Sequence, residues 1–411
     1  MHRCSSVFVL LLFALPVQAE DWPQWLGPNR DASTTETVKP WKGKLKVLWK
    51  QPVGEGHSSP VVANGKVFLH TKANGAEEEV VQAFDAKTGK PMWESSYKRS
   101  PYKGLFGNGP RATPCVQDGK VYTFGISGIL SCYDAEKGTK IWQIDTVKDF
   151  SPKRLLFGCS TTPIVEGDKL LLNVGAKGAS IVAFDKNTGK VQWKTLDDGP
   201  SYSSPIAFGK GIERTIVFLT QEGLVGLSPK DGSVFWRFPF KDRASESSST
   251  PVKAGDVLVG SAITRGTVTL KLDNKRNVPG VKKMWVDSKL TCYFSTPIAV
   301  DKHLYMVTGM MPSLFNRNVQ STLHCVETET GKHVWNKKGV GTFHASLLRT
   351  GDNKLLLLEE KGSLVLLNAT PKGYEELARD RICASTWAHP ALANGHLYIR
   401  DGKELICLQL P

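Results

Sequence analysis

The stretch FDAKTGKPMW, residues 84–93, decides the fold of this protein because close copies of it return along the chain. The copies are YDAEKGTKIW (133–142), FDKNTGKVQW (184–193) and VETETGKHVW (326–335). They share the spacing acid-x3-Gly-x3-Trp, and a further copy at residues 228–236 keeps the spacing with Ser228 in place of the acid. A sequence period of about 40–50 residues is typical of a propeller or a solenoid.

Each period also contains the signals of four short strands. It opens with a small residue, a hydroxyl residue and usually proline, as in SSPVV (58–62), ATPCV (112–116) and TTPIV (161–165). Two further turn signals follow, for example Asn64-Gly65 and Ser127-Gly128, with alternating apolar residues on either side, which is typical of hairpins. Three turns in each period predict a four-stranded antiparallel blade.

The number of openings gives the number of blades. They lie at Pro60, Pro114, Pro163, Pro205, Pro251, Pro297, Leu347 and Pro390. No residues remain after the eighth opening for an outer strand, so we expect the segment around Trp49 to supply it and leave no open sheet edge. The predicted fold is therefore all-β: an eight-bladed β-propeller of four-stranded antiparallel blades, whose ring is closed by an N-terminal strand that completes the last blade.

The repeated motif should be the turn between the third and fourth strands, in which glycine adopts a positive φ and tryptophan packs on the neighbouring blade. The glycines are Gly89, Gly138, Gly189, Gly232 and Gly331, and the tryptophans are Trp49, Trp93, Trp142, Trp193, Trp236, Trp285 and Trp335. The seventh repeat has degenerated, and Leu377 stands where we expect its tryptophan. Cys132, Cys325 and Cys407 fill a position that holds Ala or Gly in other repeats, which predicts buried thiols rather than a disulfide framework.

The first residues differ from the rest. MHRCSSVFVLLLFALPVQAE has a basic residue, an apolar run and a small-x-small site, so residues 1–19 are predicted to be a signal peptide. We assign residues 20–44 to an N-terminal arm and 45–411 to the propeller, and expect an exported chain, periplasmic or extracellular, without a transmembrane segment.

The net charge of the chain is strongly positive. Loss of Arg3 with the signal peptide leaves 52 basic against 39 acidic residues, a net charge of +13. That charge favours anionic partners or serves solubility, nucleic acid is not expected, and a closed ring needs no second copy, so we expect a monomer.

AFDAKTGKPMW (83–93) and AFDKNTGKVQW (183–193) resemble the repeat of pyrroloquinoline quinone (PQQ)-like propellers, which has an Ala-x-Asp-x3-Gly-Lys-x2-Trp core. The phrases DWPQWLGPNRD (21–31), GNGPRATP (107–114) and SYSSPI (201–206) are similar to the exported bacterial subgroup grouped with BamB, the propeller lipoprotein of the outer-membrane barrel-assembly complex. The resemblance covers nearly all of the mature chain. It implies the propeller fold, which hosts both scaffolds and dehydrogenases.

Resemblance to the quinoprotein dehydrogenases of this superfamily would imply two adjacent cysteines that pack against the quinone, and a calcium site formed by carboxylate and amide groups. This chain has no Cys-Cys pair and short connections in most blades. Acids near the expected mouth of the channel are scattered singly and match no motif: Glu55, Asp149, Asp197, Asp198 and Glu246. We therefore assign no catalytic residue, no metal site and no cofactor. The alternative is a quinoprotein dehydrogenase that uses PQQ and calcium to oxidise an alcohol or sugar.

Connections between blades should share one face with the turns between second and third strands, and the irregular segments 94–112, 145–160 and 309–321 lie there. Variable loops on a fixed scaffold are the usual place for binding.

The residue before each opening proline is usually a repeated Ser or Thr, but the residue two positions before that one varies from blade to blade. These variable residues should ring the channel mouth. The mouth candidates for ligand or partner binding are His57, Arg111, Tyr202, Phe294, His344 and Trp387, with Ser160 and Ser248 completing the ring. Aromatic and basic residues suit an anionic or ring-bearing ligand, or they plug the funnel by packing.

A second candidate is a basic and aromatic patch on the two longest loops. Its members are Lys98, Arg99, Tyr102, Lys103, Phe106, Lys153, Arg154 and Phe157. Aromatic and Arg enrichment is typical of a protein interface, although a loop that covers itself has the same composition. The resulting hypothesis is a non-catalytic scaffold that binds envelope proteins. Binding of anionic glycans or other anionic surface polymers through the same face is a further alternative, and it would be sensitive to salt.

Overall fold

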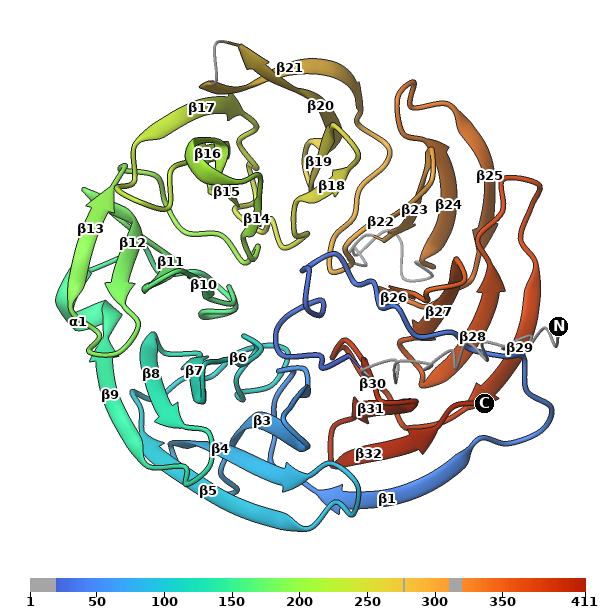
Figure 1. The fold of residues 1–411 in the computed structure, drawn as a ribbon, viewed down its shortest axis with the longest axis horizontal. Helices are drawn as coiled ribbons and strands as arrows, with labels where there is room; N and C mark the ends of the chain where they lie inside the picture. The colour runs from blue at the N-terminus through green and yellow to red at the C-terminus, as the bar shows by residue number, and fades with distance from the viewer. Residues whose placement is uncertain (1–19, 276–277, 310–319) are drawn as a thin grey trace, which may run out of the picture.

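The computed structural model describes residues 20–275, 278–309 and 320–411, so the predicted signal peptide lies outside the described residues. Eight four-stranded sheets are arranged as blades around a central axis (Figure 1). Every strand pairs antiparallel with its neighbour, and the predicted eight-bladed β-propeller is confirmed.

The first four blades follow one another in the chain. Blade one is β2 (Val61–Ala63), β3 (Lys66–Lys72), β4 (Glu78–Asp85) and β5 (Pro91–Lys98). Blade two is β6 (Cys115–Gln117), β7 (Lys120–Phe124), β8 (Ile129–Asp134) and β9 (Lys140–Asp145), and the helix α1 (Thr146–Phe150) follows it. Blade three is β10 (Ile164–Glu166), β11 (Lys169–Ala176), β12 (Ala179–Asp185) and β13 (Val191–Thr195). Blade four is β14 (Ile206–Phe208), the 3-10 helix η1 (Gly211–Glu213), β15 (Thr215–Leu219), β16 (Gly223–Leu227) and β17 (Val234–Pro239).

The last four blades complete the circle. Blade five is β18 (Val252–Ala254), β19 (Val257–Ala262), β20 (Gly266–Lys275) and β21 (Val278–Asp287). Blade six is β22 (Ile298–Val300), β23 (His303–Thr308), β24 (Thr322–Glu327) and β25 (His333–Lys338). Blade seven is β26 (Ala345–Arg349), β27 (Lys354–Glu359), β28 (Ser363–Asn368) and β29 (Glu376–Arg381). Blade eight is β30 (Ala391–Ala393), β31 (His396–Arg400), β32 (Glu404–Gln409) and β1 (Lys46–Pro52).

The middle strands of each blade form the core. All five residues of β15 (TIVFL) are buried, as are the four leucines of β27. A strand between two packed sheets is covered on both faces, so its sequence is a continuous apolar run instead of an alternation. The outer strand β5, by contrast, is mostly exposed.

Closure of the ring by the N-terminal strand is confirmed. Blade eight has the order β1-β32-β31-β30, and Trp49 in β1 pairs with Cys407 in β32. Both ends of the chain therefore contribute to one blade, and no blade in the described chain lacks its outer strand.

Six of the seven predicted tryptophans donate a hydrogen bond from their blade to the next one. The indole Nε1 donates to the backbone carbonyl just after the acid position of the following repeat, over 2.9–3.2 Å; the pairs are Trp49–Ala86, Trp93–Ala135, Trp142–Lys186, Trp193–Pro229, Trp285–Thr328 and Trp335–Thr370. For five of these tryptophans the motif glycine of the following blade lies under the ring with a positive φ, for example 71° at Gly138; the exception is Trp335. The structural role predicted for the motif is confirmed at these positions.

Strand register explains the small residue in the third strand of each motif. Cys132 lies directly opposite Trp142, and Cys325 lies opposite Trp335, so only a small side chain fits beside the indole. All seven cysteines among the described residues are unpaired and five are buried, in agreement with the predicted thiols.

The register also corrects the prediction for blade seven. Ala378, not Leu377, takes the tryptophan position, because it pairs with Leu366 as Trp335 pairs with Cys325. The turn from Asn368 to Glu376 is longer than the turn from Glu327 to His333 in blade six, which moves the position along the sequence. The large and small partners are exchanged in this blade: leucine stands in the small slot of the third strand, and alanine replaces the indole.

The predicted bond between blades, accepted by the hydroxyl before the opening proline, is formed at five openings. The backbone N–H of Ser59 donates to Thr113 Oγ1 at 3.2 Å, and that of Thr113 donates to Thr162 Oγ1 at 3.1 Å. The N–H of His389 donates to Ser59 Oγ at 2.8 Å and carries the pattern across the closure.

The N-terminal arm plugs the central channel, which the sequence did not indicate. Trp22 stacks on His389 with ring centroids 6.2 Å apart, and Trp25 meets the same imidazole edge-on at 5.8 Å. The Trp25 indole donates to Thr250 Oγ1 at 2.9 Å. The buried Arg30 guanidinium donates to the carbonyl oxygens of Pro163 and Thr162. The arm therefore contacts inner strands on several sides of the ring.

From the centre the arm runs outward over blade seven to β1, as the blue segment in Figure 1 shows. Ser33 forms a bridge with Arg349 in β26, and Leu45 N–H donates to Asp380 in β29 at 2.7 Å. Among the described residues, no helix is long and apolar enough to cross a membrane.

Candidate functional site

A shallow pocket of about 120 Å³ occupies the mouth of the channel, where the loops leading into the blades converge. Its lining contains five of the six mouth candidates: His57, Arg111, Tyr202, Phe294 and Trp387. Ser160 and Ser248 also line it, and Trp25 of the arm adds a further aromatic wall. The structure therefore brings together most of the ring that the sequence predicted.

The sixth mouth candidate, His344, does not line this pocket. Its side chain is buried, with Nδ1 3.3 Å from Ser295 Oγ and Nε2 3.1 Å from Ser346 Oγ. Burial and the positive field of His389 lower its pKa to about 3, so the ring is neutral. These contacts indicate that His344 has a structural role within the wall of the propeller, outside the pocket.

Trp387 is the centre of an aromatic cluster in the mouth. Its ring stacks with His57 and with Phe294, at centroid distances of 5.3 Å in each case, and meets Phe106 at 5.1 Å. Its Nε1 donates to Glu360 Oε1 at 2.9 Å. Since these rings fill much of the funnel with one another, the space left for a ligand is small.

The basic groups of the mouth are held by backbone carbonyls. Arg111 donates from Nε to the carbonyl of Phe157 at 2.9 Å and from Nη2 to those of Phe106 and Gly107, both at 3.2 Å. His57 Nε2 lies 2.8 Å from the Phe106 carbonyl, and burial followed by the charge of Arg111 lowers its pKa to about 4. Arg111 thus ties the loops of blades one to three together.

The two loops that Arg111 joins carry the same phrase, LFG, at residues 105–107 and 156–158. In both, the phenylalanine lines the mouth, and the Phe106 and Phe157 rings are 5.5 Å apart. In both, the glycine has a positive φ, 83° and 73°. The leucine points outward in both, since Leu105 is 76% and Leu156 64% exposed.

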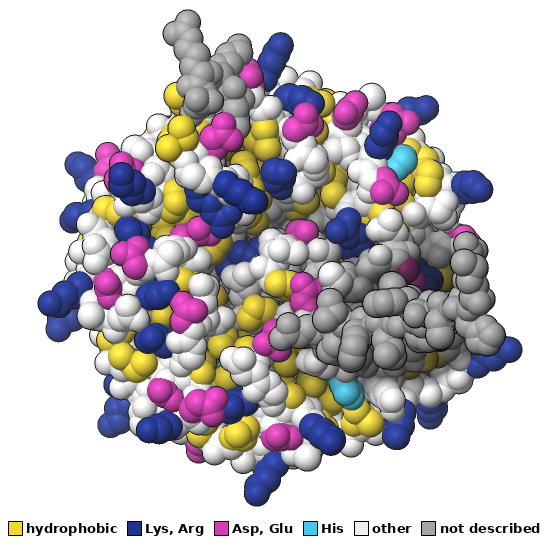
Figure 2. All heavy atoms as spheres, viewed as in Figure 1, with side chains coloured by type: hydrophobic (Ala, Val, Ile, Leu, Met, Phe, Trp, Pro, Cys, Tyr) yellow, Lys and Arg dark blue, Asp and Glu magenta, His cyan; other side chains and the backbone are white. Residues whose placement is uncertain are grey.

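The predicted patch is only in part a surface. Lys98, Lys103, Lys153 and Arg154 are exposed, and Tyr102 and Phe106 are half-buried. Arg99 and Phe157 are buried, so they do not belong to an exposed surface. Figure 2 shows basic side chains around the whole rim of the face in view, with acidic ones between them.

Arg99 is buried because two acids in blade one pair with it. Its Nη1 is 3.0 Å from Glu79 Oε1, and its Nη2 is 3.0 Å from Glu77 Oε2. Glu79 also accepts from Tyr97 OH and from the Ile126 N–H of blade two. Burial alone would raise the pKa of Glu79, but its hydrogen bond with His70, the charge of that group and the other bonds lower it.

Four of the five acids that the sequence placed near the mouth have structural partners, among them Asp197, which accepts from the N–H of Gly178 at 2.6 Å. Asp198 is paired with Arg237 at 2.6 Å, Glu246 accepts from Tyr293, and Glu55 accepts from the N–H of Asn108 at 2.7 Å. No carboxylate lines the mouth pocket, and the described residues contain no group of three or more His, Cys, Asp or Glu side chains arranged for a metal.

These residues do not fit PQQ with calcium at the mouth. The cofactor is a planar three-ring quinone with carboxylates, and calcium takes six or more oxygen ligands, carboxylates foremost. The pocket offers about 120 Å³, an arginine already bonded to three carbonyls and no acid. We therefore derive no oxidation step for this site.

Sequence reasoning missed Trp25, Leu105 and Leu156. The arm has no repeat to align, so nothing indicated that Trp25 reaches the channel. The outward leucines could have been found, because the phrase LFG occurs in equivalent loops of adjacent blades and a repeated apolar residue in an irregular loop is unusual.

The eight blades with their repeated Trp–Gly contacts and loop-covered mouth define a PQQ-like β-propeller. The chain belongs to the family described as Outer membrane protein assembly factor BamB, which matches residues 42–101 and 77–337. It is 20% identical over 302 residues to Outer membrane protein assembly factor BamB of Yersinia pestis, covering 71% of each chain. It is 21% identical over 342 residues to the protein of that name in Shewanella oneidensis, covering 80% of this chain and 81% of the relative.

Dehydrogenases are similar over a shorter part. Identity to the dehydrogenase subunit of Alcohol dehydrogenase (quinone) from Gluconobacter oxydans is 29% over 182 residues, 40% of this chain and 22% of that protein. The solved structure of BamB from Moraxella catarrhalis has a TM-score of 0.62 at 14% identity, covering 90% of this chain and 98% of that one. Quinohemoprotein Alcohol Dehydrogenase from Comamonas testosteroni has a TM-score of 0.68 at 14% identity, covering 95% and 80%. Such structural likeness shows the shared fold alone.

Proposed function

We propose that this chain is an exported, non-catalytic scaffold that binds protein partners of the bacterial envelope through its loop face. Two relatives that match most of the chain are named for outer membrane protein assembly, which supports a role in the same process. The mouth supports it too, because its aromatic and basic groups are bonded to one another and to the loops.

The observation that carries the proposal is the pair of outward leucines, Leu105 and Leu156. They occupy equivalent positions in adjacent blades, and Tyr102 OH of one loop donates to the Leu156 carbonyl of the other at 3.1 Å. Removing a leucine side chain from water is worth about 1.5–3 kcal/mol, so leaving two exposed on bonded loops favours a partner that covers them.

The charge around the leucines favours an acidic partner surface. Lys103, Lys153 and Arg154 are exposed on the same two loops, and Lys98 is exposed at the end of β5. Opposite charge across an interface speeds association and fixes orientation. We expect an apolar contact with the leucines at the centre and ion pairs at the rim.

Site-specific photo-crosslinking in the native envelope tests this. A photoreactive residue at Leu105 or Leu156 should capture the same protein partner. One at Ile212, which is 74% exposed on η1 in the first turn of blade four, is the matched control and should not capture it. Equal capture at all three positions, or capture of no protein at the leucines, would contradict the proposal.

Binding of an anionic surface polymer is the remaining alternative for this face. It would depend on the four exposed cations and not on the leucines, and it would weaken steeply with salt. Leu105→Ser together with Leu156→Ser should abolish partner capture, whereas replacement of the cations by Gln should abolish polymer binding.

A further inference from the structure

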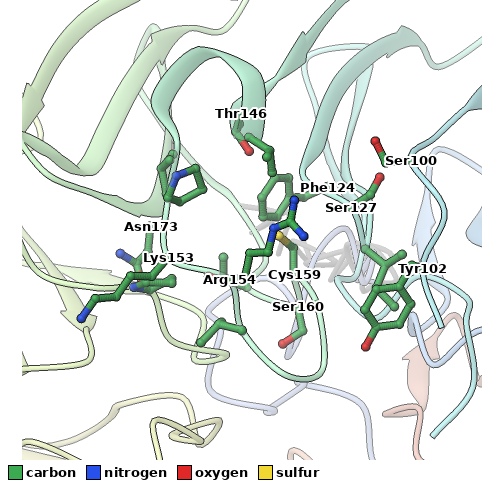
Figure 3. A pocket seen from close by; sticks show the side chains of 18 of the residues that line it. Ser100, Tyr102, Phe124, Ser127, Thr146, Lys153, Arg154, Cys159, Ser160 and Asn173 are labelled. Atoms are coloured by element: carbon green, nitrogen blue, oxygen red, sulfur yellow. The ribbon is translucent and has the colours of Figure 1, made fainter. Parts of the chain in front are cut away.

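A second cavity, of about 260 Å³, lies beside the mouth between the loops of blades two and three (Figure 3). Tyr102, Phe124, Cys159 and Asn173 are among the residues that line it, with the loop of residues 152–155. It shares Ser160 with the mouth pocket but is otherwise separate. Lys153 and Arg154 line this cavity and also belong to the charged rim of the proposed leucine contact, whereas neither leucine lines the cavity.

The size of the cavity suits a small organic molecule. An apolar cavity of about 150 Å³ is enough to hold benzene, so about 260 Å³ accepts one ring and a short chain. Much of the wall is apolar, with Tyr102, Phe124, Ile126, Val147 and Val174.

The polar groups of the wall favour an anion. No Asp or Glu lines the cavity, while Lys153 and Arg154 both do. Figure 3 shows the Arg154 guanidinium extending over the cavity near Phe124 and Cys159, and the Lys153 amine pointing away from its centre. The Lys153 amine donates to Gln221 at 3.3 Å, whereas no described carboxylate pairs with Arg154.

Two further groups at the wall are available. Ser127 Oγ is buried and has no hydrogen-bond partner among the described residues, although a buried hydroxyl usually has one. Cys159 is a free thiol, whose pKa burial raises to about 12, so it presents a neutral and slowly reacting sulfur to the cavity. A bound molecule would contact both.

We propose that this cavity binds a small amphipathic anion, with an aromatic or branched aliphatic group against Phe124 and Cys159 and a carboxylate at Arg154. Because Arg154 and Leu156 lie on one loop, an occupied cavity would also hold the exposed leucine in a single position.

The test uses 3-phenylpropionate as the probe on the purified mature chain. Calorimetry should detect its binding, and the neutral analogue 3-phenylpropionamide should bind at least about tenfold more weakly, since the charge-assisted bond to Arg154 is lost. Arg154→Gln should weaken the acid by about tenfold and leave the amide unchanged. Lys148→Gln, an exposed change in α1 outside the cavity wall, is the control and should change affinity less than about twofold.

Thiol labelling locates the bound molecule. In a Cys383→Ser background, which removes the other partly exposed thiol, 3-phenylpropionate should slow alkylation of Cys159 as followed by mass spectrometry. Equal binding of acid and amide, an unchanged Arg154→Gln variant, or no protection of Cys159 would each overturn the proposal. These results do not depend on crosslinking at the leucines, so the two proposals fail separately.

A peptide with a C-terminal phenylalanine carboxylate distinguishes the source of the anion. If it competes with 3-phenylpropionate and its C-terminal amide does not, the cavity accepts the end of a polypeptide. If only the free acid binds, the cavity serves a small molecule. Both results uphold the site.

Discussion

The indole of Trp93 in blade one occupies the space where a side chain at Gly138 in blade two would begin. A Cβ built on Gly138 would lie 2.4 Å from Trp93 Cε3. The Trp93 Nε1 donates to the carbonyl of Ala135 in the same turn at 3.0 Å. One tryptophan thus contacts one turn both through packing and through a hydrogen bond.

Gly138→Ala should destabilise the protein by two effects, a residue with positive φ and a clash with the indole. Gly119→Ala is the matched control, since its φ is 70° but nothing lies within 4 Å of its Cβ. We expect roughly 1–2 kcal/mol for the control and about 1–3 kcal/mol more for Gly138→Ala. Denaturant midpoints of both variants measure the difference, and equal midpoints would show that the indole contact costs nothing to disturb.

Trp193→Ala should lower the free energy of unfolding by roughly 3 kcal/mol, at the lower end for a large aromatic residue because the ring is partly exposed. Trp193→Phe should cost less, since it keeps an aromatic ring and loses chiefly the 3.2 Å bond from Nε1 to the Pro229 carbonyl. Thermal and denaturant unfolding measure both. A neutral alanine variant would remove the motif's role in joining blades.

Glu79→Gln should destabilise blade one by about 3–5 kcal/mol, because the buried Arg99 loses a charged partner. Glu78→Gln, one residue earlier in β4 and partly exposed, is the control and should stay within about 0.5 kcal/mol of the wild type. Denaturant unfolding compares the two. Similar midpoints would mean that Glu77 alone satisfies Arg99.

Stability should fall as the pH drops below 6.5. His344, with a pKa lowered to about 3, and His389, also lowered by burial, are neutral in the folded chain and take up protons on unfolding. Their contribution is therefore present above the unfolded pKa of about 6.5 and is lost as the pH falls towards the folded value. Unfolding midpoints between pH 7 and pH 4.5 should decline less steeply in His344→Gln than in the wild type; parallel curves would count against a neutral buried His344.

Arg111→Gln should loosen the two long loops without opening the ring. Its guanidinium bonds the carbonyls of Phe106, Gly107 and Phe157, and glutamine cannot reach all three. Hydrogen exchange at residues 104–108 and 155–159 should speed up while β7 and β11 stay protected. The control is Lys103→Gln, an exposed change on the same loop. Equal hydrogen-exchange rates in the two variants would argue against a role for Arg111 in holding the loops together.

The repeat carried most of the fold prediction because one physical unit is used many times. The eight blade openings were enough to predict the number of blades. The segment around Trp49 was enough to predict that an N-terminal strand completes the last blade and closes the ring. The seventh blade shows the limit: a longer turn between β28 and β29 moved the tryptophan position by one residue, from Leu377 to Ala378, and without an indole nothing in the sequence marks the new position.

The site was predicted less fully, since its geometry depends on contacts distant in sequence. The position of the mouth residues followed from the blade register, and five of the six candidates meet in one pocket. Arg99 seemed exposed in sequence because it stands among lysines in a loop, and its burial depends on Glu79 in a neighbouring strand. The arm in the channel lies outside every repeat, so Trp25 had no aligned counterpart.

Pairing of β1 with β32 sets an order of events for the folding chain. Trp49 is made early, yet its partner Cys407 lies almost at the other end of the sequence. Blades one to seven can form in succession from local hairpins, but the first strand waits until the last one exists. β1 precedes blades one to seven in the chain but is thus among the last strands to reach its place, and until then its backbone groups lack a partner strand.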